Sequence, residues 1–222
     1  MAKNKKPIVI AIDGPAASGK GSLGRKLAKH LGLEYLDTGK LYRYVGVKLM
    51  QSGVDIKKAE DHNSDVSFQA IEISKNIRVN EMDKEDLQCE GVGAAASIVS
   101  AIPGVRKALL DFQRSVGISK NGAVLDGRDI GTVVFPEADF KFFITANIEV
   151  RAERRYKELQ KHRNGVIYSS VLEDLKERDK RDSMRKISPL RPAKDAIHID
   201  TTYLDADEVF RQVLQRIENS RD

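Results

Sequence analysis

A glycine-rich segment, Gly14-Pro15-Ala16-Ala17-Ser18-Gly19-Lys20-Gly21-Ser22, constrains this chain more than any other feature of its sequence. It follows the apolar run 8–12 and precedes Leu23, Leu27 and Leu31, which are spaced as on one face of a helix. A buried strand, a phosphate-binding loop and a helix fit this order. Glycines let backbone N–H groups surround phosphate oxygens, and the lysine adds charge near the β and γ phosphates. We therefore predict that this segment binds the phosphates of a nucleotide.

The lysine of this loop is followed by Gly21, so the hydroxyl that usually comes next stands one residue later, at Ser22. This order resembles the phosphate loop of nucleoside monophosphate kinases more than that of GTPases. An ordinary glycine-rich turn is the simpler alternative, but the strand before the loop and the helix after it favour phosphate binding. A GTPase or general ATPase would use the same loop, yet the sequence has no Asn-Lys-x-Asp box for reading guanine.

Asp126 ends the apolar run 123–125 and takes the position of a second acidic motif. A carboxylate there can hold Mg²⁺ directly or through water, together with the hydroxyl of Ser22. An aspartate that only caps a strand end is the alternative. We predict a Mg²⁺ site at Ser22 and Asp126, with Mg²⁺ as the cofactor of an ATP-dependent reaction.

Four short apolar runs predict buried strands, at residues 8–12, 123–125, 140–145 and 196–199. The stretches between them are long enough to hold crossover helices. Strands that alternate with helices form a parallel sheet with right-handed connections and helices on both faces. We therefore predict an α/β fold of three layers with a parallel sheet, in which the run 8–12 is the central strand.

Two segments do not follow this alternation. Residues 62–86 are polar, with apolar side chains that face each other across Lys75-Asn76, and they predict a small β insertion. Residues 151–185 are densely charged and helical in pattern, with a break near Asn164-Gly165, and they predict a mobile helical lid. We expect one domain over residues 1–222, with insertions at about 62–92 and about 151–185.

Composition narrows the function classes. The 222 residues are 41% hydrophobic and 32% charged, which suits a globular core and excludes a disordered chain. One cysteine excludes an internal disulfide, and four scattered histidines form no metal motif. No uncharged stretch is as long as the roughly 20 residues of a transmembrane helix, and no signal peptide is evident. The expected location is the cytoplasm.

The basic residues concentrate in one part of the chain. The net charge is +5, and residues 151–191 hold 13 basic against 7 acidic side chains. Arg178, Arg181, Asp182 and Arg185 are spaced to share one face of a helix, where they could converge on a phosphate. A solvated, salt-bridged helix face is the alternative. A second arginine group at positions 151, 154 and 155 is less specific.

Further candidates lie at the probable ends of strands. Arg128 and Asp129 follow a predicted strand, and ligands bind at the carboxyl ends of strands in parallel sheets. Thr38 stands at a predicted helix start, and Arg43 follows about one turn later. The two residues suit phosphate binding, and a simple N-cap at Thr38 is the alternative. Nothing local distinguishes Ser97 and Arg106. Cys89 and the histidines are interpreted as structural.

Five motifs occur in order along the chain: GPAASGKGS, LDTGKLYR, AASIVSAIPGVRKALL, LDGRDIGTVVFPEADFKFF and KERDKRDSMR, the last followed by SPLRPA and AIHID. Together they resemble the bacterial cytidylate kinases, and the similarity covers almost the whole chain. The predicted β insertion is similar to the enlarged monophosphate-binding insert of that family. The chain departs from the family near Cys89, where an Arg-Thr pair is usual, and at Ala94, where asparagine is common.

The resemblance implies direct in-line transfer of the γ-phosphoryl group of ATP to CMP and dCMP, in pyrimidine nucleotide metabolism. It implies a three-layer P-loop kinase core with a parallel five-stranded sheet. It also implies that Gly14 to Ser22 bind ATP, with Lys20 as the main positive charge on its phosphates, and that Asp182 reads the ribose. Two further sets would hold the CMP phosphate and the cytosine. The first set, for phosphate, is Thr38, Arg43, Arg128 and Arg185, with Arg178 reaching the transferring group; the second, for cytosine, is Ser97, Arg106 and Asp129. Asp129 can accept from the N4 amino group, which uracil lacks. Lys20, Arg128, Arg178 and Arg185 are the predicted catalytic residues.

Two other functions stay open at this point. A related kinase that acts on UMP, AMP or a non-nucleotide would share the ATP loop but not the cytosine set. A nucleic-acid-binding protein would explain the basic segment, but the chain has no tryptophan, no aromatic-rich strand motif and no basic tail. We expect small-molecule substrates, no nucleic acid or membrane partner, and a monomer.

Overall fold

The computed structural model describes residues 7–89, 91–161 and 164–220. Its strands are β1 (Ile8–Asp13), β2 (Glu34–Asp37), β3 (Gly122–Gly127), β4 (Phe140–Thr145) and β5 (Ile197–Asp200). Its helical segments are α1 (Lys20–Leu31), α2 (Thr38–Gln51), η1 (Ile56–Glu60), α3 (Asp65–Lys75), α4 (Val79–Met82), α5 (Val92–Val99), α6 (Pro103–Gly117), η2 (Ile130–Val134), α7 (Ile148–Gln160), α8 (Tyr168–Met184) and α9 (Ala206–Glu218).

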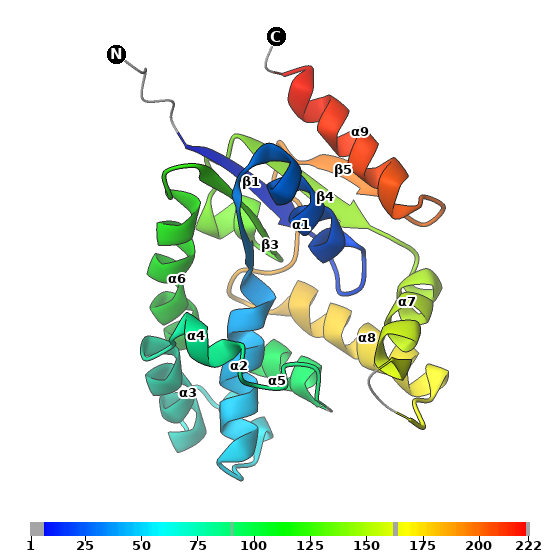
Figure 1. The fold of residues 1–222 in the computed structure, drawn as a ribbon. Helices are drawn as coiled ribbons and strands as arrows, with labels where there is room; N and C mark the ends of the chain where they lie inside the picture. The colour runs from blue at the N-terminus through cyan, green and yellow to red at the C-terminus, as the bar shows by residue number, and fades with distance from the viewer. Residues whose placement is uncertain (1–6, 90, 162–163, 221–222) are drawn as a thin grey trace.

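The five strands form one parallel sheet in the order β2-β3-β1-β4-β5. Apolar side chains of β1 alternate between its faces: Ile10 and Ile12 pack against α1 and α9, whereas Val9 and Ala11 pack against η2 and α6. Figure 1 shows α1 and α9 on one face of the sheet and α6 on the other. The prediction of a three-layer α/β fold with residues 8–12 in the central strand is confirmed.

Strand β2 is the fifth strand, for which the sequence indicated no position. It pairs with β3 alone, at an edge of the sheet, and none of its four residues is fully buried. The apolar run that marks a strand buried on both faces is therefore absent from β2. Its place is fixed by pairing, because Glu34 to Asp37 lie in register with Ala123 to Asp126.

The predicted β insertion is wrong, because residues 62–86 contain the helices α3 and α4. Ser64 caps α3 by accepting a hydrogen bond from the Ser67 N–H group at 3.2 Å. The buried side chains of α3, among them Val66 and Ala70, are spaced by helical turns, while Phe68 is 55% exposed. The alternation of residues 66 and 68 suggested a strand, but only one of the two faces the core.

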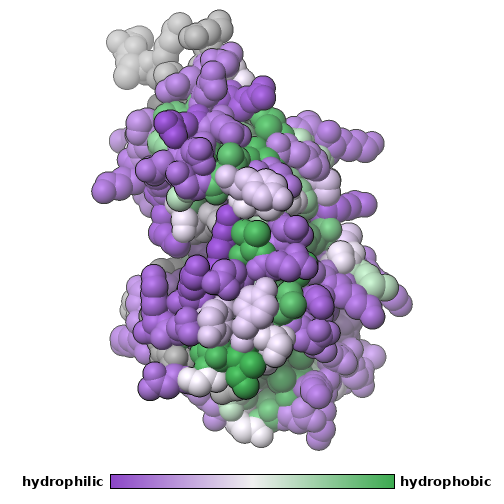
Figure 2. Space-filling view, turned by 90° about the vertical axis from the view of Figure 1, so that its right-hand side faces the viewer, coloured by the Kyte–Doolittle hydropathy of each residue, from purple (hydrophilic) through white to green (hydrophobic). Residues whose placement is uncertain are grey.

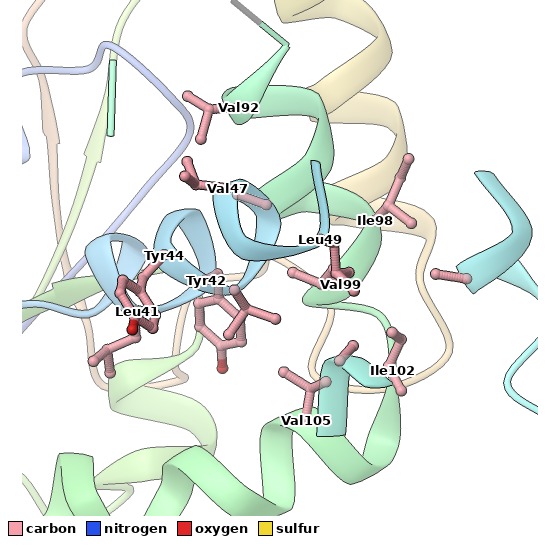
Figure 3. Close-up of a cluster of buried hydrophobic side chains, with 14 of the residues drawn as sticks. Leu41, Tyr42, Tyr44, Val47, Leu49, Val92, Ile98, Val99, Ile102 and Val105 are labelled. Atoms are coloured by element: carbon pink, nitrogen blue, oxygen red, sulfur yellow. The ribbon is translucent and has the colours of Figure 1, made fainter. Parts of the chain in front are cut away.

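Helices α2 and α5 form the centre of a second core beside the sheet. Leu41, Val45 and Leu49 of α2 pack with Val92 and Val99 of α5 and with further side chains from η1, α3 and α6. Figure 3 shows apolar side chains of α2 and α5 pointing toward one another. Small residues allow close approach: a Cβ added at Gly46 of α2 would lie 2.9 Å from the Cβ of Ala95.

Residues 148–160 and 168–184 form two packed helices, α7 and α8, so the prediction of a helical segment there is confirmed. Ala152 of α7 and Val171 and Leu175 of α8 pack against Ala16 of the glycine-rich loop. Hydrophilic side chains predominate on the face seen in Figure 2. That α7 and α8 move as a lid, and that the chain is one domain with two insertions, stay predictions.

Within the described ranges, no single helix has the length and apolar character needed to cross a membrane. Helices α5 and α6 reach that length only together, and they are bent by 95° at the break between them.

Candidate active site

A cleft of about 680 Å³ opens at the carboxyl ends of the strands, between the glycine-rich loop and the helices α7 and α8. Residues 16–22 line it, together with side chains from β2, α2, β3, α7, α8 and the start of α9. A smaller cavity of about 40 Å³ adjoins it, and Gly39, Arg128 and Arg178 line both. The size of the larger cleft is typical of nucleotide and cofactor sites.

The glycine-rich loop has the backbone of a phosphate-binding loop. A Cβ added at Gly14 would lie 2.0 Å from the carbonyl oxygen of Ile144, so only glycine fits at this position. Gly19 adopts a left-handed conformation, with φ of 92°, as the N-cap of α1. Helix α1 begins at Lys20 and ends at the left-handed glycine cap Gly32. The N–H groups at the start of α1 therefore face the cleft, where they can bind an anion.

Lys20 lies at the base of the cleft. Its Nζ donates a hydrogen bond to the carbonyl oxygen of Pro15 at 3.1 Å, and the side chain is buried. Burial, followed by repulsion from the Arg128 guanidinium, lowers the pKa of Lys20 to about 7. The Asp126 and Asp37 carboxylates offset this effect only in part, and a bound polyphosphate would favour the charged ammonium group further.

Two carboxylates, those of Asp37 and Asp126, line the cleft on the wall next to the loop. Asp126 Oδ2 accepts a hydrogen bond from the Tyr35 hydroxyl at 2.7 Å, and a Cβ added at Gly21 would lie 3.3 Å from the same oxygen. Glycine after the loop lysine therefore leaves room for Asp126. Burial, and then the nearby Asp37 carboxylate, raises the pKa of Asp126.

The oxygens on this wall fit Mg²⁺. Ser22, Asp37 and Asp126 line the cleft with the hard oxygen donors that Mg²⁺ prefers. Among the residues that the structure places, no cluster of three or more His, Cys, Asp or Glu side chains could hold a metal ion alone. A cation here would take its other ligands from phosphates and water, which is usual for Mg²⁺ in kinases.

Two arginines stand where the cleft meets the smaller cavity. Arg128 Nε donates to Asp182 Oδ2 at 3.0 Å, and Arg178 Nε lies 3.9 Å from the same oxygen. Burial, followed by repulsion from Arg128, lowers the pKa of Arg178 to about 10. One carboxylate is therefore shared by two guanidinium groups, which leaves net positive charge at the junction.

The smaller cavity brings together residues that are far apart in the sequence. Arg106 Nη2 forms a buried ion pair with Asp129 Oδ2, and Ser97 Oγ donates to Asp182 Oδ1 at 2.9 Å. Burial opposes ionisation of Asp182, but Arg128, Arg178 and Arg185 outweigh it and lower its pKa. The cavity thus presents fixed charges and donors over a small volume.

Several buried polar atoms around these cavities lack a hydrogen-bond partner. Among the residues that the structure covers, they include Arg43 Nε, Arg178 Nε and Arg185 Nη2. Buried donors without partners are rare in folded proteins, and each one costs free energy. Three buried arginine donors without hydrogen-bond partners, around the two adjoining cavities, indicate a site for a polyanion.

The structure brings the predicted site residues to these two cavities, apart from Gly14 and Pro15, which form the start of the loop and line neither. Thr38 donates to the Asp126 carbonyl oxygen at 2.7 Å, and Arg43 forms an ion pair with Asp37 at 2.7 Å. Arg181, grouped with Arg178 from its spacing, lines neither cavity. The roles of these residues stay predictions.

Sequence reasoning missed several cleft residues. Arg154 donates to both oxygens of Thr201, at 2.9 Å to Oγ1 and 2.7 Å to the carbonyl. Arg155 donates to Gln88 Oε1 at 3.3 Å, so α7 contacts the segment before α5. The arginine pair itself was visible in the sequence, but only the packing of α7 turns it into the cleft. Asp37 gave no signal beyond its position before Thr38.

Asp13 is a buried carboxylate that connects the start of the glycine-rich loop with the segment after Arg128 and Asp129. It ends β1, directly before the loop, and its two oxygens accept hydrogen bonds from the N–H groups of Ile130 and Gly131, each at 2.8 Å. These N–H groups follow Arg128 and Asp129. Burial raises the pKa of Asp13 to about 7, although the two N–H groups favour its charged form.

This pKa predicts a pH-dependent stability. Between the ordinary value of 3.8 and about 7, folded Asp13 holds a proton that the unfolded chain has lost. The contribution of Asp13 to the free energy of unfolding is therefore complete below about pH 4 and is lost as the pH rises through about 7. We expect the free energy of unfolding, measured by urea denaturation from pH 4 to 8, to fall less in Asp13→Asn than in the wild type. Asp139→Asn, whose exposed carboxylate accepts from the Val9 N–H group, is the control; identical profiles for all three proteins would contradict the assignment.

A parallel sheet in this strand order, with a phosphate loop after its central strand and an adjoining basic cavity, defines a P-loop kinase. The family model for cytidylate kinase matches residues 10–219. The chain belongs to the cytidylate kinase family.

Individual relatives agree with this assignment. The cytidylate kinase of Paramagnetospirillum magneticum is 50% identical over 216 residues, which cover 96% of this chain and 99% of that protein. The cytidylate kinase of Azorhizobium caulinodans is 48% identical over 214 residues, with coverage of 96% and 100%. A crystal structure of an uncharacterized protein from Eubacterium ventriosum has a TM-score of 0.52 at 15% identity, over 97% of this chain and 99% of that one, and supports the fold alone.

Proposed function

We propose that the protein transfers the γ-phosphoryl group of ATP to the phosphate of CMP or dCMP, forming ADP and CDP or dCDP. The observation that carries this proposal is the junction of the two cavities, where Arg128 and Arg178 lie together and share one carboxylate. Two anions that react with each other must meet between cations. The larger cleft would hold ATP, and the residues around the smaller cavity would bind the nucleoside monophosphate.

The reaction needs no covalent intermediate with the protein. An oxygen of the CMP phosphate attacks the γ-phosphorus, a new P–O bond forms, and the bond to the β–γ bridging oxygen breaks, so that ADP leaves. Because the attacking phosphate is already a dianion, no general base is needed. Lys20 and the junction arginines would neutralise the charge, and the walls of the cleft would align the two nucleotides.

Mg²⁺ would be held through Ser22 and Asp126, with Asp37 nearby, and when bound it would neutralise charge on the ATP phosphates. The helices α7 and α8 would close over the reacting groups and exclude water, which otherwise competes with CMP as the acceptor. Their packing on Ala16 of the loop offers a direct path from ATP binding to closure.

Base selection would lie with Asp129 and Arg106 in the smaller cavity. Asp129 can accept from the cytosine N4 amino group, and Arg106 can donate to ring acceptors. Ser97 can donate to the ring only when its hydroxyl leaves Asp182. Uracil carries an oxygen at the same position, which would face a carboxylate and be rejected. The pairing of Arg106 with Asp129 holds both side chains ready for this contact.

A coupled ADP-release assay with Mg·ATP and CMP, dCMP, UMP or AMP tests the proposal. We expect kcat/KM for CMP and dCMP to exceed that for UMP by roughly 100-fold, as a lost polar contact in a buried site implies. Asp129→Asn should reduce this ratio to about tenfold or less. Turnover of none of the four acceptors would contradict the proposal, and turnover that prefers UMP or AMP would favour another kinase of the same class.

A further inference from the structure

Helix α5 ends at Ser100, where two arginines from other elements converge. Arg106 Nη1 donates to the Ser100 carbonyl oxygen at 3.0 Å, and Arg185 Nη1 donates to Ser100 Oγ at 2.9 Å. The Ser100 hydroxyl uses its own proton in a hydrogen bond to the Ser97 carbonyl oxygen at 2.9 Å. Its lone pairs therefore remain directed at Arg185, and the partly negative end of α5 attracts both cations.

The contacts of Arg185 show what this hydroxyl does. Arg185 Nε donates to the Ser188 carbonyl oxygen at 2.6 Å, and Nη1 donates to Ser100. A planar guanidinium held at two points has a fixed orientation. Its third nitrogen, Nη2, is buried, has no hydrogen-bond partner, and lies 3.9 Å from Asp129 Oδ1 at the wall of the smaller cavity. Without the Ser100 bond, the Ser188 hydrogen bond and the longer ion pair with Asp129 would remain to orient the group.

Ser100 itself is placed accurately by packing. It is 6% exposed and follows directly on the helix that packs against α2 at Gly46 and Ala95. Ser97, one turn earlier on α5, donates to Asp182. Helix α5 and its cap residue therefore hold three side chains of the proposed acceptor site from one rigid element. These are Asp182 for the ribose, Arg106 for the base and Arg185 for the phosphate.

We infer that Ser100 is a positioning residue for the acceptor nucleotide, which acts by orienting Arg185 toward the monophosphate. This inference rests on the proposed function. Ser100 lines the smaller cavity, but its hydroxyl is already bonded to the Ser97 carbonyl oxygen and to Arg185. Its carbonyl oxygen holds Arg106 and its hydroxyl holds Arg185, so the two arginines keep one spacing. The family resemblance pointed to Ser97 and not to Ser100, whose contact with Arg185 spans 85 positions and gives no local signal.

Ser100→Ala tests this inference, because it removes the bond to Arg185 and keeps the carbonyl that holds Arg106. We expect the KM for CMP to rise on the order of tenfold, while the KM for ATP stays within about twofold, as for the loss of one charged hydrogen bond. Ser100→Thr keeps the hydroxyl and should retain most of the CMP affinity. Ser115→Ala is the matched control, because Ser115 Oγ makes the same type of bond, to the Phe112 carbonyl oxygen at 2.7 Å, outside the site.

A double-mutant cycle separates positioning from a general effect on α5. In an Arg185→Ala background, Ser100→Ala should raise the KM for CMP by no more than about twofold, because the side chain that it orients is gone. The inference is overturned if Ser100→Ala leaves the KM for CMP unchanged, raises both KM values equally, or acts undiminished in that background. Wild-type protein that does not phosphorylate CMP would instead refute the proposed function, and the inference with it.

Discussion

Lys20→Met should lower kcat/KM for phosphoryl transfer by about a thousandfold or more, the largest single effect we expect in this protein. Methionine keeps the length and apolar stem of the side chain but removes the charge that would stabilise the β and γ phosphates. The loss should fall on kcat as well as on the KM for ATP, because charge on these phosphates increases in the transition state.

The same substitution should not destabilise the fold. Lys20 is buried, and burial together with Arg128 already lowers its pKa to about 7, so its charged form is disfavoured before any ligand binds. We expect Lys20→Met to unfold at a urea concentration no lower than that of the wild type at pH 7. Lys26→Met is the control: Lys26 also lies on α1, is exposed, and forms an ion pair with Asp207.

An unchanged rate in Lys20→Met would remove Lys20 from the site and leave the loop as a structural turn. A lost rate together with a large loss of stability would show that the lysine holds the loop together through its bond to Pro15. Only loss of activity with retained stability supports a phosphate-binding lysine. The Lys26→Met control should retain wild-type kcat/KM, because exposed ion pairs contribute little to stability and Lys26 lies outside the cleft.

Arg178→Met should lower kcat by about a hundredfold to a thousandfold, with smaller changes in the KM values for ATP and CMP. Arg178 lines both cavities, so it can contact the phosphoryl group while it passes from one nucleotide to the other. An interaction that exists mainly in the transition state affects kcat more than KM. Asp182 keeps its hydrogen bond to Arg128 in this variant, so its carboxylate retains a cationic partner.

Arg181→Met is a matched control for Arg178. Both arginines lie on α8, one turn apart, and both contribute to the basic segment. Arg181 lines neither cavity, so its substitution should change kcat by no more than about twofold. Equal losses in steady-state kcat for the two variants would mean that α8 acts through its overall charge, and would contradict a specific role for Arg178.

Much of the fold could be predicted because its signals are local. The loop stands between a run of β-branched residues and leucines at helical spacing, so strand, loop and helix follow from adjacent residues. β2 gave no such signal, because an edge strand with no fully buried residue carries no continuous apolar run. The apolar pattern of residues 62–86 predicts strands because alternation over a few residues fits both periods, whereas the Ser64 cap favours a helix.

The candidate site divides in the same way. The residue types and their order along the chain determined the ATP loop, the arginine-rich helix and the family resemblance, because each depends on neighbours within a few positions. Only the tertiary structure decided that Arg178 and not Arg181 reaches the junction, that Arg154 and Arg155 turn into the cleft, and that Asp13 and Ser100 support the site from behind. These contacts join residues up to 118 positions apart, and which face of a helix turns inward is set by the elements packed against it.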